Sequence, residues 1–123
     1  MTVGCDIEDP GRFAGILKDS RLLSNIFTED EIVSSMRRSR PEVHLARKFA
    51  CKEAVFKALS SAGCDVPLKL IEITGIAGGG FTVKIAKRGI GKAYRLSVGV
   101  SGRKDAVLAT AIAEKLATRH DAR

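Results

Sequence analysis

The sequence predicts an α+β fold in which helices pack on an antiparallel sheet, within a single domain of residues 1–123. Three observations support this fold class. The N-terminus alternates apolar and polar residues, as a strand does. The segment up to about residue 62 carries capping signals and apolar residues at helical spacing, and the second half returns to short segments of period two. A chain of 123 residues is long enough to bury one core.

The first predicted element is a strand over Thr2–Ile7, where apolar and polar side chains alternate. A period of two places Asp6 and Glu8 on one face of this strand. The other face then carries Val3, Cys5 and Ile7. Asp9-Pro10 follows and predicts the start of a helix that continues to about Leu17, with Asp9 as its N-cap.

The capping box formed by Thr28 and Glu31 predicts a second helix, which ends in the basic run Arg37-Arg38-Ser39-Arg40. Pro41 then begins a long helix that continues to about Ala62, with Gly63 as its C-terminal cap.

An apolar stripe at helical spacing defines one face of the long helix, made of Leu45, Phe49, Phe56 and Leu59. Lys52 falls in the same stripe, which is unusual for a lysine. Glu53 and Lys57 lie on a neighbouring face, beside the small residues Ala46 and Ala50.

The second half predicts two pairs of strands. Leu70–Thr74 and Phe81–Ile85 are joined by a turn at Gly78–Gly80, and Tyr94–Val100 and Ala106–Ala113 flank Ser101-Gly102.

The net charge of +7 implies an anionic partner. Nucleic acid is the generic candidate, but aromatic residues make up only 5% and Trp is absent, so surfaces for stacking bases are scarce. A phosphorylated cofactor or an acidic protein fits the same charge. No apolar run approaches the roughly 20 residues of a membrane span, and no signal peptide is recognised. The three cysteines lack metal-ligand spacing, so we expect free thiols and a cytoplasmic location.

Two acidic pairs are candidates for chemistry, and each has a simpler explanation. Asp6 and Glu8 form either a solvated face of the strand or ligands for Mg²⁺, and the adjacent Gly4 lets a ligand approach the backbone. Glu53 and Lys57, four residues apart, taken alone form a surface pair that contributes about 0.3–0.5 kcal/mol.

The basic candidates are equally open. Lys52 either covers the core with its stem or projects from a subunit interface towards an anion. Arg37, Arg38 and Arg40 form either a solvated helix end or a grip for a terminal phosphate.

Three motifs together resemble the holo-acyl-carrier-protein synthase family of 4′-phosphopantetheinyl transferases. Members carry G-x-D, F-T-x-x-E and R-F-A-A-K-E-A-x-x-K-A in this order. The corresponding segments here are Gly4-Cys5-Asp6, Phe27-Thr28-Glu29-Asp30-Glu31 and Lys48-Phe49-Ala50-Cys51-Lys52-Glu53-Ala54-Val55-Phe56-Lys57-Ala58.

The resemblance implies the 4′-phosphopantetheinyl transferase fold and a homotrimer with sites between subunits. It implies Mg²⁺-dependent transfer of 4′-phosphopantetheine from coenzyme A to a serine of an apo acyl carrier protein, with release of adenosine 3′,5′-bisphosphate. Nucleic acid and membrane are then not partners. The carrier protein and coenzyme A are both anionic, which accounts for the basic charge.

The resemblance also assigns roles to individual residues. Asp6 and Glu53 match the Mg²⁺ ligands. Glu8 matches a third acid found in the larger, two-lobed members of the superfamily, which here ligates directly or through water. Lys57 and Lys52 match phosphate contacts, and Arg12 resembles the basic position that docks the carrier protein. The catalytic residues are then Glu53 and Lys57. The serine proton leaves either to a carboxylate such as Glu53 or to a metal-bound water.

The chain departs from the family pattern at two places. Gly102 stands where S-x-S-H usually places a histidine, and Gly79-Gly80-Phe81 replaces a G-[KR]-P turn. The missing histidine affects the hold on coenzyme A more than the type of reaction. An alternative function is therefore a catalytically weakened relative that binds coenzyme A or a carrier protein.

Overall fold

The computed structural model describes residues 1–75, 79–103 and 105–117, and it confirms the predicted α+β class. Strands β1 (Thr2–Glu8), β5 (Val107–Lys115) and β4 (Tyr94–Gly102) form an antiparallel sheet in the order β1-β5-β4. Strands β2 (Ile71–Gly75) and β3 (Phe81–Ile85) form a separate antiparallel pair.

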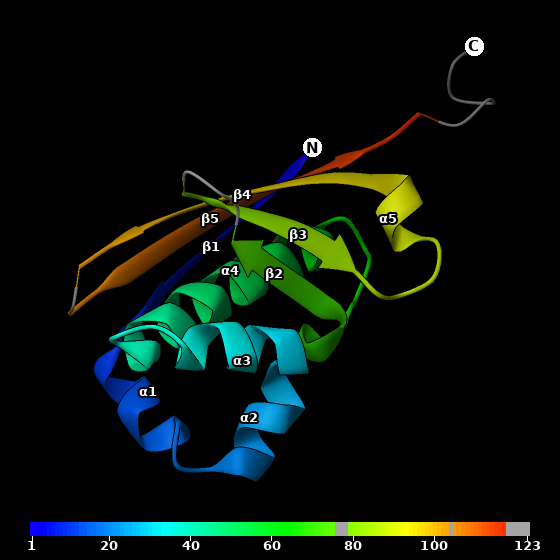
Figure 1. The fold of residues 1–123 in the computed structure, drawn as a ribbon. Coiled ribbons are helices and arrows are strands. Elements are labelled where there is room, and N and C mark those ends of the chain that lie inside the picture. Colours follow the sequence, from blue (N-terminus) through cyan, green and yellow to red (C-terminus); the bar gives the residue numbers. More distant parts are fainter. Residues whose placement is uncertain (76–78, 104, 118–123) are drawn as a thin grey trace.

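The helices of the first half lie on one side of the three-stranded sheet (Figure 1). They are α1 (Gly11–Ile16), α2 (Ser20–Ile26), α3 (Glu29–Met36) and α4 (Pro41–Ser61). A 3₁₀ turn at Leu68–Leu70 leads into β2, and the short helix α5 (Ile90–Ala93) precedes β4.

Helix α4 is the centre of the core, with the sheet on one side and α1 and α3 on the other (Figure 1). Its buried residues therefore go well beyond the predicted stripe and include Ala50, Ala54 and Ala58, all fully buried. These small side chains let the sheet approach the helix closely.

Gly4 marks the closest approach of strand and helix. A Cβ atom added at Gly4 would lie only 1.9 Å from the carbonyl oxygen of Ala54 and 2.8 Å from the nitrogen of Ala58. The interpretation that Gly4 leaves room for a ligand is therefore wrong, because its missing side chain makes room for α4. Thr2 adds a hydrogen bond from its hydroxyl to the Ala58 carbonyl at 2.5 Å.

The two faces of the sheet differ in what covers them. On β5, Ala109, Ala111 and Ala113 are buried against α4. The opposite face carries large apolar side chains that remain 41–71% exposed, namely Val3, Ile7, Leu108 and Ile112. The predicted alternation in β1 is confirmed, and its acidic face is the one that points towards the helices.

The local signals for helix ends were largely correct. Both hydrogen bonds of the capping box are present, from the Glu31 N–H to Thr28 Oγ1 at 3.2 Å and from the Thr28 N–H to Glu31 Oε1 at 2.8 Å. Gly63 adopts a positive φ of 84° after α4, as a C-terminal cap does. Helix α1 begins at Gly11 with Pro10 as its N-cap, one residue later than predicted, and the side chain of Asp9 accepts a hydrogen bond from the Gly11 N–H at 2.8 Å.

Helices α2 and α5 were not predicted. The turn expected at Gly78–Gly80 falls partly outside the described residues, since residues 76–78 and 104 and the end of the chain from 118 are not described.

Candidate functional site

Strand β1 brings Asp6 against helix α4, where it meets Lys57. The Lys57 ammonium donates to Asp6 Oδ1 at 3.1 Å and to the Cys5 carbonyl at 2.9 Å. Glu53 lies one turn before Lys57 and is close enough to Asp6 that the two carboxylates repel each other. Burial raises the pKa of Glu53 the most and the Asp6 charge raises it further, while the Lys57 charge opposes the rise. The structure thus brings Asp6 of the first strand next to Glu53 and Lys57 of the long helix.

Glu8 is the third acid of this cluster. Burial and then the neighbouring Asp6 raise the pKa of Glu8 to about 7, against a smaller opposing effect of Arg12. Arg12, at the start of α1, contacts Glu8 Oε1 at 3.2 Å and keeps 64% of its side chain exposed.

The acid cluster fits a Mg²⁺ ion that is held by few protein ligands. Asp6 Oδ2 is buried and accepts no hydrogen bond from any described residue. A buried carboxylate oxygen without a partner is unfavourable, and a cation would satisfy it. Within the described ranges no three Asp, Glu, His or Cys side chains are arranged to enclose a metal ion. Mg²⁺ does not need such an enclosure, because it commonly takes one or two carboxylates and completes its shell with water and substrate phosphates.

A basic cavity of about 940 Å³ opens between α3, the N-terminal half of α4 and the β2–β3 pair. Its lining includes Arg37, Arg38, Arg47 and Lys48, which outnumber the three acidic lining residues Asp30, Glu31 and Glu72. The Arg47 Nε is buried without a hydrogen-bond partner among the described residues, and its guanidinium carbon lies 5.9 Å from the centre of the Phe81 ring. Such a cavity suits an anion, because guanidinium groups bind phosphate oxygens in a fixed geometry.

Only some of the residues predicted to contact phosphate line the cavity. Arg37 and Arg38 line the cavity, whereas Arg40 does not and instead pairs with Glu42 at 3.3 Å. Lys52 is fully buried and its ammonium contacts Glu31 Oε1 at 2.6 Å. A phosphate contact from Lys52 does not fit this geometry, because its side chain has no exposed surface.

Sequence reasoning missed three basic residues of the cavity lining: His44, Arg47 and Lys48. The His44 Nε2 accepts a hydrogen bond from Arg38 Nε at 3.1 Å. Burial and then the positive charge of Arg38 lower the pKa of His44, so the neutral ring can accept this bond. Lys48 is the first residue of the third motif, whereas the only signal for His44 and Arg47 was their position in the first turns of the long helix, next to the arginine run.

Gly102, at the end of β4, has no space for a side chain. A Cβ atom there would lie 2.6 Å from the Ala106 carbonyl oxygen and 2.9 Å from Val107 Cα. The missing histidine is therefore accompanied by a backbone arrangement that would exclude it.

The family model of the 4′-phosphopantetheinyl transferase superfamily matches residues 2–111, which span all three motifs and both acidic elements. The chain belongs to this superfamily. The predicted resemblance to the holo-acyl-carrier-protein synthases is confirmed by the relatives and solved structures of such transferases.

Among the curated relatives, the holo-[acyl-carrier-protein] synthase of Caldicellulosiruptor bescii is 34% identical over 121 residues, which cover 94% of this chain and 98% of the relative. The Moorella thermoacetica synthase is 37% identical over 100 residues, which cover 80% and 78%. For the Nitrosomonas eutropha synthase, the 39% identical segment covers 48% of this chain and 49% of the relative's length.

Two solved transferase structures share the fold over nearly the whole chain. The holo-[acyl-carrier-protein] synthase of Neisseria meningitidis superposes with a TM-score of 0.77 at 27% identity and covers 93% of this chain and 98% of its own. The Chronobacterium ammoniagenes enzyme, solved as a complex with CoA, has a TM-score of 0.77 at 26% identity, with coverage of 94% and 98%. None of the helices in the described ranges is both long and apolar enough to cross a membrane.

Proposed function

We propose that this transferase moves 4′-phosphopantetheine from coenzyme A to a serine of an apo acyl carrier protein, in a Mg²⁺-dependent reaction that releases adenosine 3′,5′-bisphosphate. The observation that carries the proposal is the meeting of Asp6 with Glu53 and Lys57 where β1 crosses α4. Membership of the superfamily supports the same reaction class.

Asp6 and Glu53 are the residues that would hold Mg²⁺, with Glu8 beside them either as a direct ligand or behind a water. When bound, Mg²⁺ supplies positive charge against the charge that develops on the departing phosphate. Lys57 adds a second, fixed positive charge, because its ammonium lies 3.1 Å from Asp6 and its side chain remains half exposed towards a ligand.

In the reaction the serine Oγ attacks the phosphorus that carries pantetheine. The bond between this phosphorus and the bridging oxygen of the pyrophosphate breaks, and adenosine 3′,5′-bisphosphate leaves with that oxygen. The serine proton passes to a carboxylate such as Glu53 or to water. Without the metal, burial and the Asp6 charge raise the pKa of Glu53, whereas a bound Mg²⁺ would favour its ionised form.

The cavity supplies a second contact region for coenzyme A. Arg37 and Arg38 would bind phosphate there, with Arg47 beside them. Asp6, Glu53 and Lys57 are not among the residues that line this cavity. One coenzyme A molecule can contact both regions when they come from neighbouring subunits.

A homotrimer would provide such neighbours. The outer face of the sheet is apolar and exposed, with Val3, Ile7, Leu108 and Ile112 as its large residues. A second copy of the chain would cover this face. Sedimentation analysis is expected to give three times the chain mass of 13.2 kDa, and Ile112→Glu is expected to give a monomer without transfer activity. A monomeric, active wild-type protein would contradict the trimer.

Arg12 is the proposed docking residue for the carrier protein. Its guanidinium is largely exposed on α1, close to the acid cluster, and can meet an acidic partner near the reacting groups.

The test of the function is direct. The protein is incubated with coenzyme A, Mg²⁺ and an apo acyl carrier protein, and the carrier is then weighed by mass spectrometry. The expected result is the phosphopantetheine mass increment, and chelation of Mg²⁺ with EDTA should abolish it. No increment with several apo carriers would sink the proposal, and retained binding of coenzyme A would then support the alternative of a binding module.

A further inference from the structure

The ion pair of Glu31 and Lys52 is buried completely, although neither residue has a part in the proposed reaction. Glu31 Oε1 and Lys52 Nζ are 2.6 Å apart, and both side chains have no exposed surface. Lys52 Nζ also lies 5.7 Å from the centre of the Phe27 ring, within the apolar core. Burial of two charges is costly, and a buried pair often adds little net stability. Stability alone therefore does not explain why this ion pair is present.

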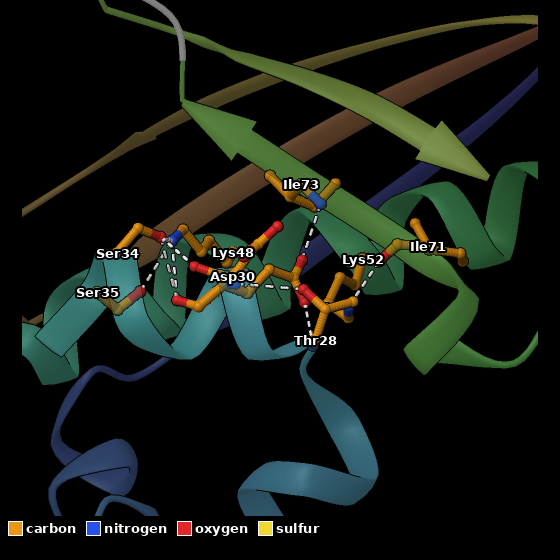
Figure 2. A network of polar contacts seen from close by, with 9 residues as sticks. Thr28, Asp30, Ser34, Ser35, Lys48, Lys52, Ile71 and Ile73 are labelled. Atoms are coloured by element: carbon orange, nitrogen blue, oxygen red, sulfur yellow. Dashed lines mark hydrogen bonds and ion pairs between the residues drawn. The ribbon is translucent and has the colours of Figure 1, made fainter. Parts of the chain in front are cut away.

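The remaining polar atoms of the pair are directed at strand β2. Glu31 Oε2 accepts a hydrogen bond from the Ile73 N–H at 2.8 Å. Lys52 Nζ donates to the Ile71 carbonyl at 2.5 Å. Figure 2 shows Lys52 next to Ile71 and a dashed contact to Ile73, two residues further along the strand.

These two hydrogen bonds replace a neighbouring strand. Strand β2 pairs with β3 on one edge, and among the described residues no strand pairs with its other edge. At that edge the carboxylate supplies an acceptor for one backbone N–H and the ammonium supplies a donor for one backbone carbonyl. An uncharged apolar pair could not do this, so the ion pair fixes β2 to α3 through Glu31 and to α4 through Lys52.

Lys48 connects the same helices nearer to the cavity. Its ammonium donates to the Glu31 carbonyl at 3.0 Å, to Ser34 Oγ at 2.6 Å and to Ser35 Oγ at 2.9 Å (Figure 2). Helices α3 and α4 are thereby held against each other, and β2 is held against both.

The elements joined in this way are the walls of the basic cavity. Its lining takes Glu31 and Ser34 from α3, Lys48 from α4, and Ile73 and Thr74 from β2. The distance between Arg38 on one wall and the β2–β3 pair on the other therefore depends on how β2 is attached.

We propose that Glu31 and Lys52 are positioning residues. They hold strand β2 at the distance from the opposite wall at which the cavity binds the nucleotide part of coenzyme A. This inference rests on the proposed function, because it takes coenzyme A as the ligand of the cavity. Lys52 does not line the cavity, and the Glu31 side chain has no exposed surface, so both residues would act through strand β2. Their loss would change the affinity for coenzyme A and leave the acid cluster around Asp6 intact.

The test compares Glu31→Gln and Lys52→Met with a matched control, Thr28→Ala. The control removes the hydroxyl that caps α3 and weakens the helix start, but leaves both hydrogen bonds to β2 in place. The steady-state rate of transfer is measured at a temperature at which each variant is folded. The concentrations of coenzyme A and of the carrier protein are varied in separate series. Binding of adenosine 3′,5′-bisphosphate is measured by calorimetry.

The expected result is a KM for coenzyme A at least tenfold higher in both variants, with a matching loss of adenosine 3′,5′-bisphosphate affinity. The kcat and the KM for the carrier protein should stay within about twofold to threefold. Thr28→Ala should lower the melting temperature without a change in KM. A purely structural pair would instead lower the amount of active protein and leave KM unchanged, and that result would overturn the proposal.

A measurement on the wild-type protein covers the case in which both variants fail to fold. Amide hydrogen exchange at Ile73 should slow at least tenfold when adenosine 3′,5′-bisphosphate binds, and by more than exchange at Ala111 in the sheet core. Equal slowing at both sites would contradict the positioning role. A wild-type protein that performs no transfer would instead contradict the proposed function, so the two failures are distinguishable.

Discussion

Replacement of Gly4 by alanine tests whether the close approach of β1 to α4 creates the acid cluster. The added Cβ would lie 1.9 Å from the Ala54 carbonyl oxygen, whereas Cβ atoms do not come within 3.0 Å of such an atom. Both contacts are backbone, so no side chain can turn away. Strand β1 must then move from the helix by about 1 Å, since a packed core has no spare volume.

The expected cost is about 3 kcal/mol of unfolding free energy, at the upper end of the usual range for overpacking. For a chain of this size that corresponds to a melting temperature lower by about 10–15 °C. Transfer should fall about 100-fold even in the folded fraction, because a displacement of about 1 Å separates Asp6 from Glu53 and Lys57.

The assays are thermal unfolding by circular dichroism and transfer measured by mass spectrometry of the carrier protein. Gly91→Ala in helix α5 is the control, because the added Cβ there would meet no atom within 4 Å. The control should match the wild type in both assays. A Gly4→Ala protein with wild-type stability and full transfer would refute the close-approach explanation.

Three further predictions concern single positions. In EDTA, the free energy of unfolding should fall by up to about 3 kcal/mol as the pH rises from about 4.5 to above 7, because the raised pKa of Glu8 makes the folded state hold a proton that the unfolded state has released. Glu8→Gln should flatten this part of the pH profile, and an unchanged slope would contradict the assignment. Gly102→His should lower the melting temperature and should not increase the affinity for coenzyme A, because the Val107 backbone fills the space that the side chain would need. Tighter binding of coenzyme A, measured by calorimetry, would contradict this prediction. Arg38→Ala should raise the KM for coenzyme A about tenfold, whereas Arg40→Ala should leave this KM unchanged, because Arg40 lies outside the cavity. Equal effects of the two substitutions would rule out the cavity as the binding region.

Local signals in the sequence were sufficient for the elements that depend on neighbouring residues. The capping box at Thr28, the positive φ at Gly63 and the alternation in β1 all involve contacts within a few positions of the chain. Helix α2 was missed although Asp19 caps it through a hydrogen bond from the Leu22 N–H at 3.0 Å, so a usable signal was present.

Contacts between distant residues could not be predicted from periodicity. The bond between Lys57 and Asp6 joins positions 51 residues apart, and only the resemblance to a known family connected them. Lys52 was recognised as an anomaly within an apolar stripe, but its partner Glu31 lies 21 positions away and already had a local role in the capping box. The ligand role predicted for Lys52 was wrong because burial in the folded chain, and not charge alone, decides what a lysine can contact.

The central claim is that Asp6 and Glu53 form the reaction centre, and the most direct test is transfer by a folded Glu53→Gln variant. The exposed Glu114 on β5 provides a matched Glu→Gln control. The carrier protein is weighed after incubation with coenzyme A and Mg²⁺. We expect full phosphopantetheine transfer by the wild type and by Glu114→Gln, and a loss of at least about 100-fold in Glu53→Gln with an unchanged melting temperature. Normal turnover by a folded Glu53→Gln protein would contradict the claim.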